Sequence, residues 1–427
     1  MTRYQAPKGT QDWTPDKQPY YRWIDATVRE VAARYGFLPI DPPMFEHTEV
    51  FARGVGTGTD IVEKEMYSFE TQGGEPLTLR PEFTAGIVRA YVENGLHNQP
   101  PPVKLYAIGP LFRYERPGMG RYRQHTQISL EVIGESDPAV DLEIMSLASD
   151  IFETLGVGKL RFEINSIGCP ACRPPYIRDT LVPWLEARRE HLGETDQMRL
   201  AKNPLRVLDT KDPKVRALME AEQVPLLADS LCQECRTHFD TLRSYMDMLG
   251  RRYTVNPLLV RGFDYYTKTV FEVQSEALDT ANNALCGGGR YDGLVELLGG
   301  AATPGMGMGL GFERAALVLE ELDIAPPPLR TTQVYAVWFD EATKRAAIQT
   351  LDTLRQAAIP AEMAYAQGKR SFKSQMRAAD KSPARFTLIF GENELAQGEV
   401  MVKEMATGNQ TSVRLDNLVL WLQGHLG

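Results

Sequence analysis

The first part of the chain mixes helical and strand patterns. Apolar residues recur at helical spacing in three segments, and two further apolar runs have the character of strands. The predicted helices cover residues 20–34, 81–93 and 139–155, and the predicted strands cover residues 105–113 and 126–134. The polar loop between the strands allows them to pair antiparallel. Two more strands are predicted later in the chain, at 270–274 and 305–311.

A helical and charged stretch separates the two groups of strands. Between residues 168 and 253 the apolar positions follow a helical period, most clearly at Phe239, Leu242, Tyr245, Met246 and Leu249. We therefore predict a helical insertion within an α+β domain that is built on an antiparallel sheet.

The C-terminal part has a different pattern. Three prolines, Pro326 to Pro328, end a helical segment and favour an extended linker. Strand and helix patterns then alternate, at residues 333–339, 341–358, 361–364, 371–380 and 386–390. This alternation is typical of a small α/β domain with a mostly parallel sheet.

Composition restricts the class of protein. The chain has 427 residues, 43% hydrophobic and 24% charged, which is an ordinary globular balance. No apolar run reaches the ~20 residues that span a bilayer, and the polar start lacks a secretory signal, so we expect a cytoplasmic protein with no membrane partner. The net charge of −9 argues against a nonspecific nucleic-acid coat, but residues 331–427 are relatively basic, at +1.

Two motifs carry the clearest chemistry. Phe112-Arg113-Tyr114-Glu115 ends a strand and precedes a glycine-containing loop with Arg121, which suits phosphate binding by guanidinium groups. Gly305 to Arg314 alternates glycine with apolar residues and ends in an arginine at a predicted helix start, where anions are favoured. Taken singly, the first motif is equally consistent with a solvated hairpin tip, and the second with close strand–helix packing.

Together these motifs resemble a known family. Phe112–Glu115 and Gly309–Arg314 resemble the second and third motifs of class II aminoacyl-tRNA synthetases, and Phe37–Phe45 resembles the weak first motif. Residues 259–267, LVRGFDYYT, and 286–293, CGGGRYDG, look like the two histidine signatures of histidyl-tRNA synthetases, and residues 79–86, LRPEFTAG, resemble that family's amino-acid loop. The resemblance extends over essentially the whole chain.

The resemblance implies an architecture. It predicts an α+β fold with an antiparallel-sheet class II catalytic core at residues 1–168 and 254–325, interrupted by the helical insertion at 169–253. The linker at 326–331 leads to an α/β anticodon-binding domain at 332–427. The family forms homodimers, and we expect a homodimer here.

The resemblance also implies a reaction and its residues. ATP, with Mg²⁺ on its phosphates, and histidine would form histidyl-adenylate, and the histidyl group would pass to the 3′-OH of histidine tRNA. Arg113 and Arg261 would act as catalytic residues at the α-phosphate and the substrate carboxylate. The α-ammonium group would be bound by Glu82, Thr84 and Gln127. The imidazole would be recognised by Glu131 and Tyr266, with Tyr265 and Tyr291 as walls, although core packing is the simpler role for Tyr265.

The ATP-binding residues implied by the resemblance are Arg113, Arg121, His125 and Arg314. Arg121 and Arg314 would hold the outer phosphates or stack on adenine. His125 departs from the family pattern, which usually has phenylalanine stacking on adenine. Gly118 and Met119 occupy a loop where some relatives have polar residues that contact the tRNA acceptor end, so acceptor-end recognition stays open.

Four of the five cysteines form two CxxC pairs, Cys169/Cys172 and Cys232/Cys235. Four thiolates suit a tetrahedral structural Zn²⁺ ion, and the alternative is free thiols or a redox-labile pair.

The C-terminal domain contains basic residues at a spacing of four, namely Lys369, Lys373, Arg377 and Lys381, which we call the basic stripe. On a helix it would be one face, which is either simply solvated or, given the resemblance, in contact with tRNA phosphates.

A second function stays open on sequence grounds. Non-catalytic paralogues of this family regulate histidine biosynthesis, but they usually lack the C-terminal domain and lose the signatures. This chain keeps Arg113, Arg261, Arg314 and residues 331–427.

Overall fold

The computed structural model describes residues 4–56, 59, 61–118, 120–277, 284–329, 332–365 and 371–426, with the backbone alone at residue 63. The chain forms two compact units, Met1–Pro326 and Pro327–Gly427. Among the helices of the described residues, none has the length and apolar character that crossing a membrane requires.

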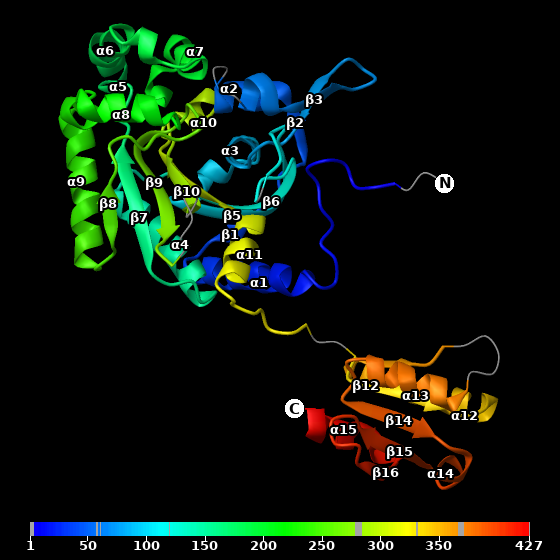
Figure 1. Ribbon diagram of the computed structural model, residues 1–427. Coiled ribbons are helices and arrows are strands. Elements are labelled where there is room, and N and C mark those ends of the chain that lie inside the picture. The colour runs from blue at the N-terminus through cyan, green and yellow to red at the C-terminus, as the bar shows by residue number, and fades with distance from the viewer. Residues whose placement is uncertain are drawn as a thin grey trace. The chain divides into compact units, whose positions relative to one another are not determined.

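The first unit is built on an eight-stranded sheet in the order β1-β5-β6-β11-β10-β9-β7-β8 (Figure 1). Only the two edge pairs, β1 with β5 and β7 with β8, are parallel. The predicted hairpin is present, because β5 and β6 pair antiparallel along their full length. The strands are β1 (Leu38–Pro39), β5 (Val103–Phe112), β6 (Gln124–Ile133), β7 (Leu160–Ser166), β8 (Tyr253–Val255), β9 (Thr267–Ser275), β10 (Ala284–Arg290) and β11 (Gly305–Gly311).

Helices cover both faces of this sheet. One face packs against α1 (Gln18–Arg34), α4 (Pro138–Thr154), α9 (Gln233–Met248) and α11 (Phe312–Glu321) in a single apolar core. The other face packs against α3 (Thr84–Glu93), α10 (Leu294–Leu297) and the part of the insertion that precedes α9. A small sheet in the order β2-β4-β3 lies beside α2, which also contacts η1. These elements are β2 (Phe45–His47), α2 (Thr48–Val55), η1 (Ile61–Glu65), β3 (Tyr67–Glu70) and β4 (Pro76–Leu79), and η2 (Leu96–Asn98) contacts α3.

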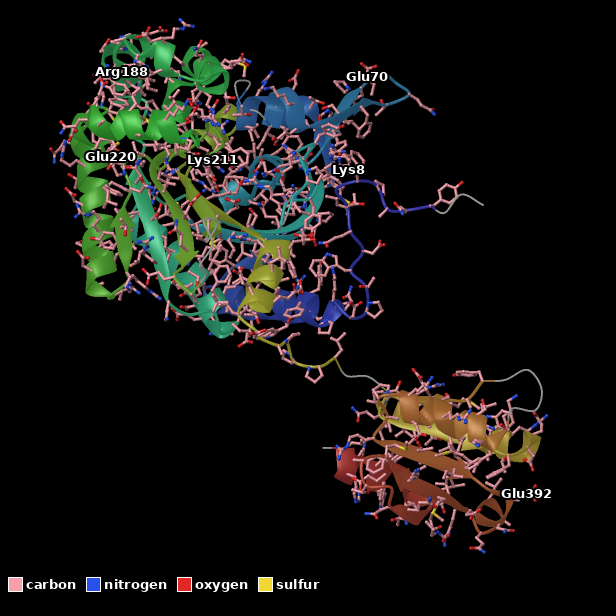
Figure 2. The ribbon with its side chains drawn as sticks, viewed as in Figure 1. Lys8, Glu70, Arg188, Lys211, Glu220 and Glu392 are labelled. Carbon is pink, nitrogen blue, oxygen red and sulfur yellow. The ribbon has the colours of Figure 1, made fainter. Side chains whose placement is uncertain are left out.

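The stretch between β7 and β8 is helical, as its apolar period predicts. Figure 2 shows Glu220 exposed on the helix at residues 213–221 and Arg188 in the turn at residues 187–188. Its last helix, α9, buries Phe239, Leu242 and Met246 against the main core. The preceding elements are α5 (Arg173–Tyr176), η3 (Ile177–Leu181), α6 (Val182–Glu186), η4 (Arg189–His191), α7 (Glu194–Lys202), η5 (Pro204–Val207), α8 (Pro213–Ala221) and η6 (Leu227–Ser230).

The second unit has a five-stranded sheet in the order β13-β12-β14-β15-β16. The sequence prediction of a mostly parallel sheet is only half right, because β14–β15 and β15–β16 are antiparallel. The two last strands form a hairpin after the segments that the alternation predicted. The elements are β12 (Val334–Trp338), α12 (Glu341–Gln356), β13 (Ala361–Met363), α13 (Phe372–Lys381), β14 (Phe386–Phe390), α14 (Glu392–Ala396), β15 (Glu399–Glu404), β16 (Gln410–Arg414), η7 (Leu415–Asn417) and α15 (Leu418–Leu426).

Candidate active site

The two faces of β6 have opposite character. Ile128, Leu130 and Val132 lie in the main apolar core, so the residues between them face the other side. These are Gln127, Ser129 and Glu131, a row of polar side chains on a central strand. A polar row in the middle of a sheet is costly unless its groups are hydrogen-bonded, which indicates a functional site.

A small polar cavity of about 110 Å³ lies over this row. Its walls come from β6, β10, β11, the turn before α3, the residue after β5 and the segment before β9. The lining residues are Glu82, Thr84, Arg113, Gln127, Ser129, Arg261, Phe263, Tyr265, Tyr266, Gly287, Tyr291, Gly307, Met308 and Gly309. Eight of the nine residues that the sequence predicted for histidine binding are among them.

The ninth residue, Glu131, lies directly behind the cavity wall and is fully buried. Its carboxyl group accepts hydrogen bonds from the hydroxyls of Thr84 at 2.7 Å, Ser129 at 2.8 Å and Tyr291 at 2.6 Å. Burial raises the pKa of Glu131 to about 8, although these hydroxyls oppose the shift. At pH 7 this carboxyl is therefore mainly protonated, and an N–H donor or cation bound beside it would favour its ionised form.

Glu82 is a second buried carboxyl in the wall. It accepts hydrogen bonds from the backbone N–H groups of Thr84, at 2.5 Å, and Ala85, at 2.8 Å, at the start of α3. Burial raises the pKa of Glu82 despite these bonds. Two carboxyls at one end of the cavity give it the character of a site for a cationic group.

The glycines of β10 and β11 make room for the polar side chains. A Cβ atom at Gly307 would lie 1.9 Å from Oε2 of Glu131, and one at Gly305 would lie 2.1 Å from the Tyr291 ring. At Gly309 the nearest atom would belong to Gln127, at 2.9 Å. The alternating glycines therefore leave space for polar and aromatic side chains of the protein itself.

Two arginines enter the cavity from different elements. Arg113 follows β5, and its Nε donates to the carbonyl oxygen of Pro81 at 2.7 Å. The guanidinium of Arg261 forms an ion pair with Glu272 of β9 at 2.5 Å and lies over Gly287, where a Cβ atom would be only 2.8 Å from it. Two fixed cations facing one small cavity suit a carboxylate or phosphate group.

The remaining residues predicted for ATP lie outside this cavity. His125 is on β6, two residues before Gln127, and burial followed by the positive charge of Arg113 lowers its pKa to about 3. Arg314 is in the first turn of α11, where its Nε donates to the carbonyl oxygen of Ala284 at 3.2 Å. Arg121 is exposed in the loop between β5 and β6. Met119, in the same loop, lies outside the described residues.

Six of the fourteen lining residues were not among those predicted for histidine binding, and two of these, Ser129 and Phe263, make side-chain contacts within the site. Ser129 donates to Glu131, and the two-residue period of the strand between Gln127 and Glu131 could have identified it. Phe263 stacks on Tyr265 with ring centres 5.1 Å apart, and the guanidinium of Arg113 lies 5.7 Å from its ring centre. Tyr265 thus both packs against an aromatic neighbour and lines the cavity.

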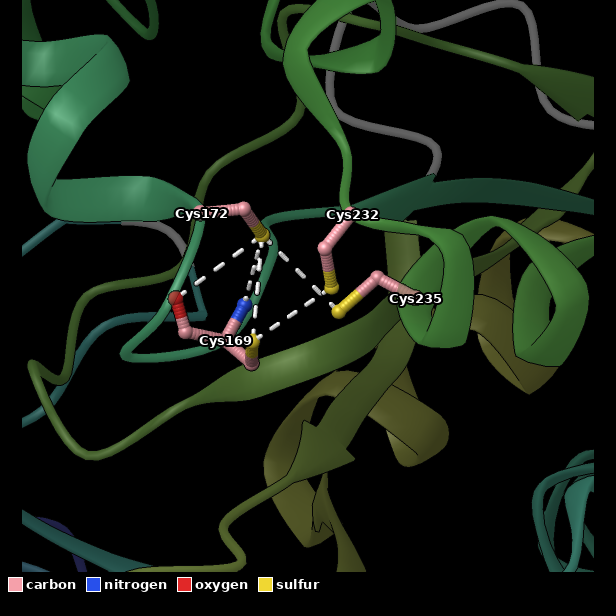
Figure 3. Close-up of side chains that lie close together, drawn as sticks. All are labelled: Cys169, Cys172, Cys232 and Cys235. Atoms are coloured by element: carbon pink, nitrogen blue, oxygen red, sulfur yellow. Dashed lines mark hydrogen bonds between the residues drawn. The ribbon is translucent and has the colours of Figure 1, made fainter.

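The four cysteines of the two CxxC pairs converge at one point (Figure 3). Their sulfur atoms lie within 4.8 Å of one another. The sulfur of Cys169 is 3.8 Å from those of Cys172 and Cys232, and the sulfurs of Cys172 and Cys235 are 3.9 Å apart. The two pairs therefore form one cluster at the base of the insertion.

The basic stripe of the second unit lies on α13. Lys373, Arg377 and Lys381 are exposed, while Gln375 and Ala379 are buried against the sheet. The three cations therefore share the outer face of this helix. Lys369 lies outside the described residues.

Family models match both units of the chain. The model described as Histidyl-tRNA synthetase matches residues 9–170 and 187–315, and the model described as Anticodon binding domain matches residues 333–425. An α+β core with an antiparallel sheet, followed by an anticodon-binding domain, is the fold of a class II aminoacyl-tRNA synthetase, and the predicted fold class is confirmed.

Individual relatives match nearly the whole chain. The chain is 45% identical to a histidine–tRNA ligase of Desulforamulus reducens and 44% identical to one of Halothermothrix orenii, with 98% of each chain covered in both comparisons. The crystal structure of apo S. aureus histidyl-tRNA synthetase superimposes with a TM-score of 0.82 at 36% identity, covering 98% of this chain and 99% of that one. The chain belongs to the histidyl-tRNA synthetase family.

Proposed function

We propose that this protein activates histidine with ATP and transfers the histidyl group to the 3′-OH of histidine tRNA. The observation that carries the proposal is the cavity: eight residues expected to bind histidine line it, and the ninth hydrogen-bonds to two of them. Its two carboxyls and two guanidiniums complement the opposite charges of an amino acid.

The arrangement supports specific roles for these groups. Glu82, Thr84 and Gln127 provide acceptor oxygens for the α-ammonium group of histidine. In its ionised form, Glu131 has about four acceptor positions, of which three are occupied by hydroxyls, so one remains for an imidazole N–H, whose binding favours that form. Tyr266 closes the pocket beside it.

The chemical step then depends on Arg113 and Arg261. An oxygen of the histidine carboxylate attacks the α-phosphorus of ATP, and the bond from that phosphorus to the β-phosphate bridging oxygen breaks, releasing pyrophosphate. The two guanidiniums neutralise charge that develops on the α-phosphate, so positioning and electrostatics provide the acceleration. His125 stacks on adenine, and Arg121 and Arg314 hold the outer phosphates. Mg²⁺ supplies further charge neutralisation on the phosphates.

We assign tRNA binding to the second unit. The exposed cations of α13 provide phosphate contacts at helical spacing.

We further propose a cytoplasmic homodimer. In the segment from β1 to β2, Leu38, Met44 and Phe45 each have more than half of their surface exposed. Several exposed large apolar side chains close together in the sequence suggest a surface that a partner covers.

The four cysteines are proposed to hold a structural Zn²⁺ ion. With Zn–S bonds of about 2.3 Å, a tetrahedral ion places its sulfurs about 3.8 Å apart. The three sulfur–sulfur distances of 3.8, 3.8 and 3.9 Å match this spacing. Metal analysis of the purified protein should find about one zinc per chain, and Cys232→Ser should lower it. A stable protein without zinc would support free thiols instead.

Histidine-dependent exchange of pyrophosphate into ATP tests the proposed function. The wild-type protein should catalyse this exchange and charge histidine tRNA. The rival function, a non-catalytic regulator of histidine biosynthesis, predicts neither reaction. We disfavour it because both catalytic arginines and the anticodon-binding domain are present.

A further inference from the structure

The first CxxC turn is bound to the strand that follows the pocket tyrosines. The backbone N–H of Ile167 donates to the carbonyl oxygen of Lys268, and the N–H of Lys268 donates to that of Gly168, both at 2.8 Å. On the other side of the turn, the guanidinium of Arg173 donates to the carbonyl oxygen of Tyr266 at 2.6 Å. The residues on either side of the turn therefore hold the backbone on either side of Thr267.

The second CxxC turn is bound to the same strand through a side chain. Glu234 lies between Cys232 and Cys235, and its carboxylate is 2.8 Å from Nζ of Lys268. The same Nζ is 3.3 Å from the carboxylate of Asp292, the neighbour of Tyr291. Because the Lys268 side chain is only 11% exposed, its charge depends on these two partners for compensation.

Lys268 also has an unusual backbone. Its φ of +48° lies in the left-handed region, which a residue with a side chain adopts only when its surroundings hold it there. Those surroundings are Ile167 and Gly168 beside the first turn and Glu234 in the second. Both CxxC turns therefore help to maintain the backbone conformation of Lys268, two residues after Tyr266.

We infer that Lys268 and Arg173 are positioning residues that couple the four-cysteine cluster to the histidine pocket. The inference rests on the proposed histidine site and on zinc binding by the cysteines. Cys169 and Cys232 are 63 residues apart in the chain, and a shared ion would fix one turn against the other. Both turns hold the segment that carries Tyr266 and, through Asp292, Tyr291, so metal occupancy determines how tightly histidine binds.

The test is Lys268→Met in the full-length protein, which keeps most of the apolar stem and removes the charge. We expect about one zinc per chain, a histidine Km raised about tenfold or more, and an ATP Km within about twofold of wild type. Lys214→Met is the matched control, because Lys214 is an exposed lysine on α8 and should change neither value. Arg173→Ala should also raise the histidine Km, and Arg173→Lys should restore part of the loss.

The outcomes separate the inference from the proposals beneath it. A folded, zinc-containing Lys268→Met protein with wild-type histidine Km would overturn the coupling alone. Wild-type protein stripped of zinc that binds histidine as tightly as the zinc-containing protein would overturn the coupling, and purified wild-type protein without zinc would overturn zinc binding. Absence of histidine-dependent exchange in the wild type would overturn the proposed function. If Lys268→Met does not fold, Glu234→Gln weakens the same link at an exposed position and should raise the histidine Km without changing the ATP Km.

Discussion

Replacing Glu131 by glutamine changes a buried carboxyl into an amide of nearly the same shape. The three neighbouring hydroxyls, from Thr84, Ser129 and Tyr291, can rotate to accept as well as donate, so the fold should tolerate the change. Unlike the carboxyl, the amide cannot lose a proton to become a charged acceptor when the histidine imidazole donates to it.

The expected loss is in histidine binding. A hydrogen bond to a charged group contributes roughly 1.5–3 kcal/mol, so the affinity for histidine should fall by about ten- to one-hundred-fold. ATP contacts other residues in the proposed site, so the ATP Km should stay near the wild-type value. The loss should therefore separate the two substrates.

Although Glu131→Gln should weaken histidine binding, it should increase the stability of the folded protein at high pH. Burial raises the pKa of Glu131 to about 8 from an ordinary value of 4.5, so the folded protein keeps this proton when the unfolded chain has released it. Stability is therefore lost as pH rises from 4.5 through about 8, by on the order of 5 kcal/mol once the group is ionised. Glutamine cannot ionise, so the stability of Glu131→Gln relative to wild type should increase across this window.

The measurements are histidine and ATP Km values in pyrophosphate exchange, and thermal unfolding at pH 6 and pH 9. Glu46→Gln is a matched control, because Glu46 is a buried carboxyl that pairs with Arg89 and does not line the cavity. It should leave the histidine Km unchanged. An effect of Glu131→Gln confined to ATP, or no gain in stability at pH 9, would refute the reasoning.

Three further predictions concern Arg261, His125 and the basic stripe of the second unit. Arg261→Ala should lower adenylate formation by about 10²- to 10³-fold without unfolding the protein, and a near-wild-type exchange rate would remove Arg261 from the chemistry. Because the pKa of His125 is lowered to about 3, its imidazole stays uncharged at working pH. The ATP Km of the wild-type protein should therefore not change between pH 6 and pH 7 through protonation of His125, and the His125→Phe variant should still bind ATP. Reversing Lys373 and Arg377 to Glu should raise the tRNA Km and reduce its salt dependence while exchange stays normal; an unchanged salt slope would mean that the tRNA binds elsewhere.

Local pattern determined most of the secondary structure. The hairpin of β5 and β6, the alternation in Gly305–Gly311 and the helical insertion follow from side-chain periods of two and 3.6 residues, which act over short distances. The strand β10 was not predicted, because its glycine-rich sequence lacks the β-branched residues that mark strands. The mixed sheet of the second unit also could not be predicted, since strand direction depends on which strands pair.

For the candidate site too, some features followed from the sequence and others only from the tertiary structure. Eight of the residues that line the cavity were predicted from the resemblance of the sequence motifs to a known family, with no knowledge of their positions in space. Tertiary structure alone decided that Glu131 lies behind the wall, where burial raises its pKa, and that the glycines of β11 leave room for it. It alone joined Lys268 to Glu234 and Asp292, which are distant in the chain. Desolvation and ion pairing depend on distance in space, and no local pattern of the chain records that distance.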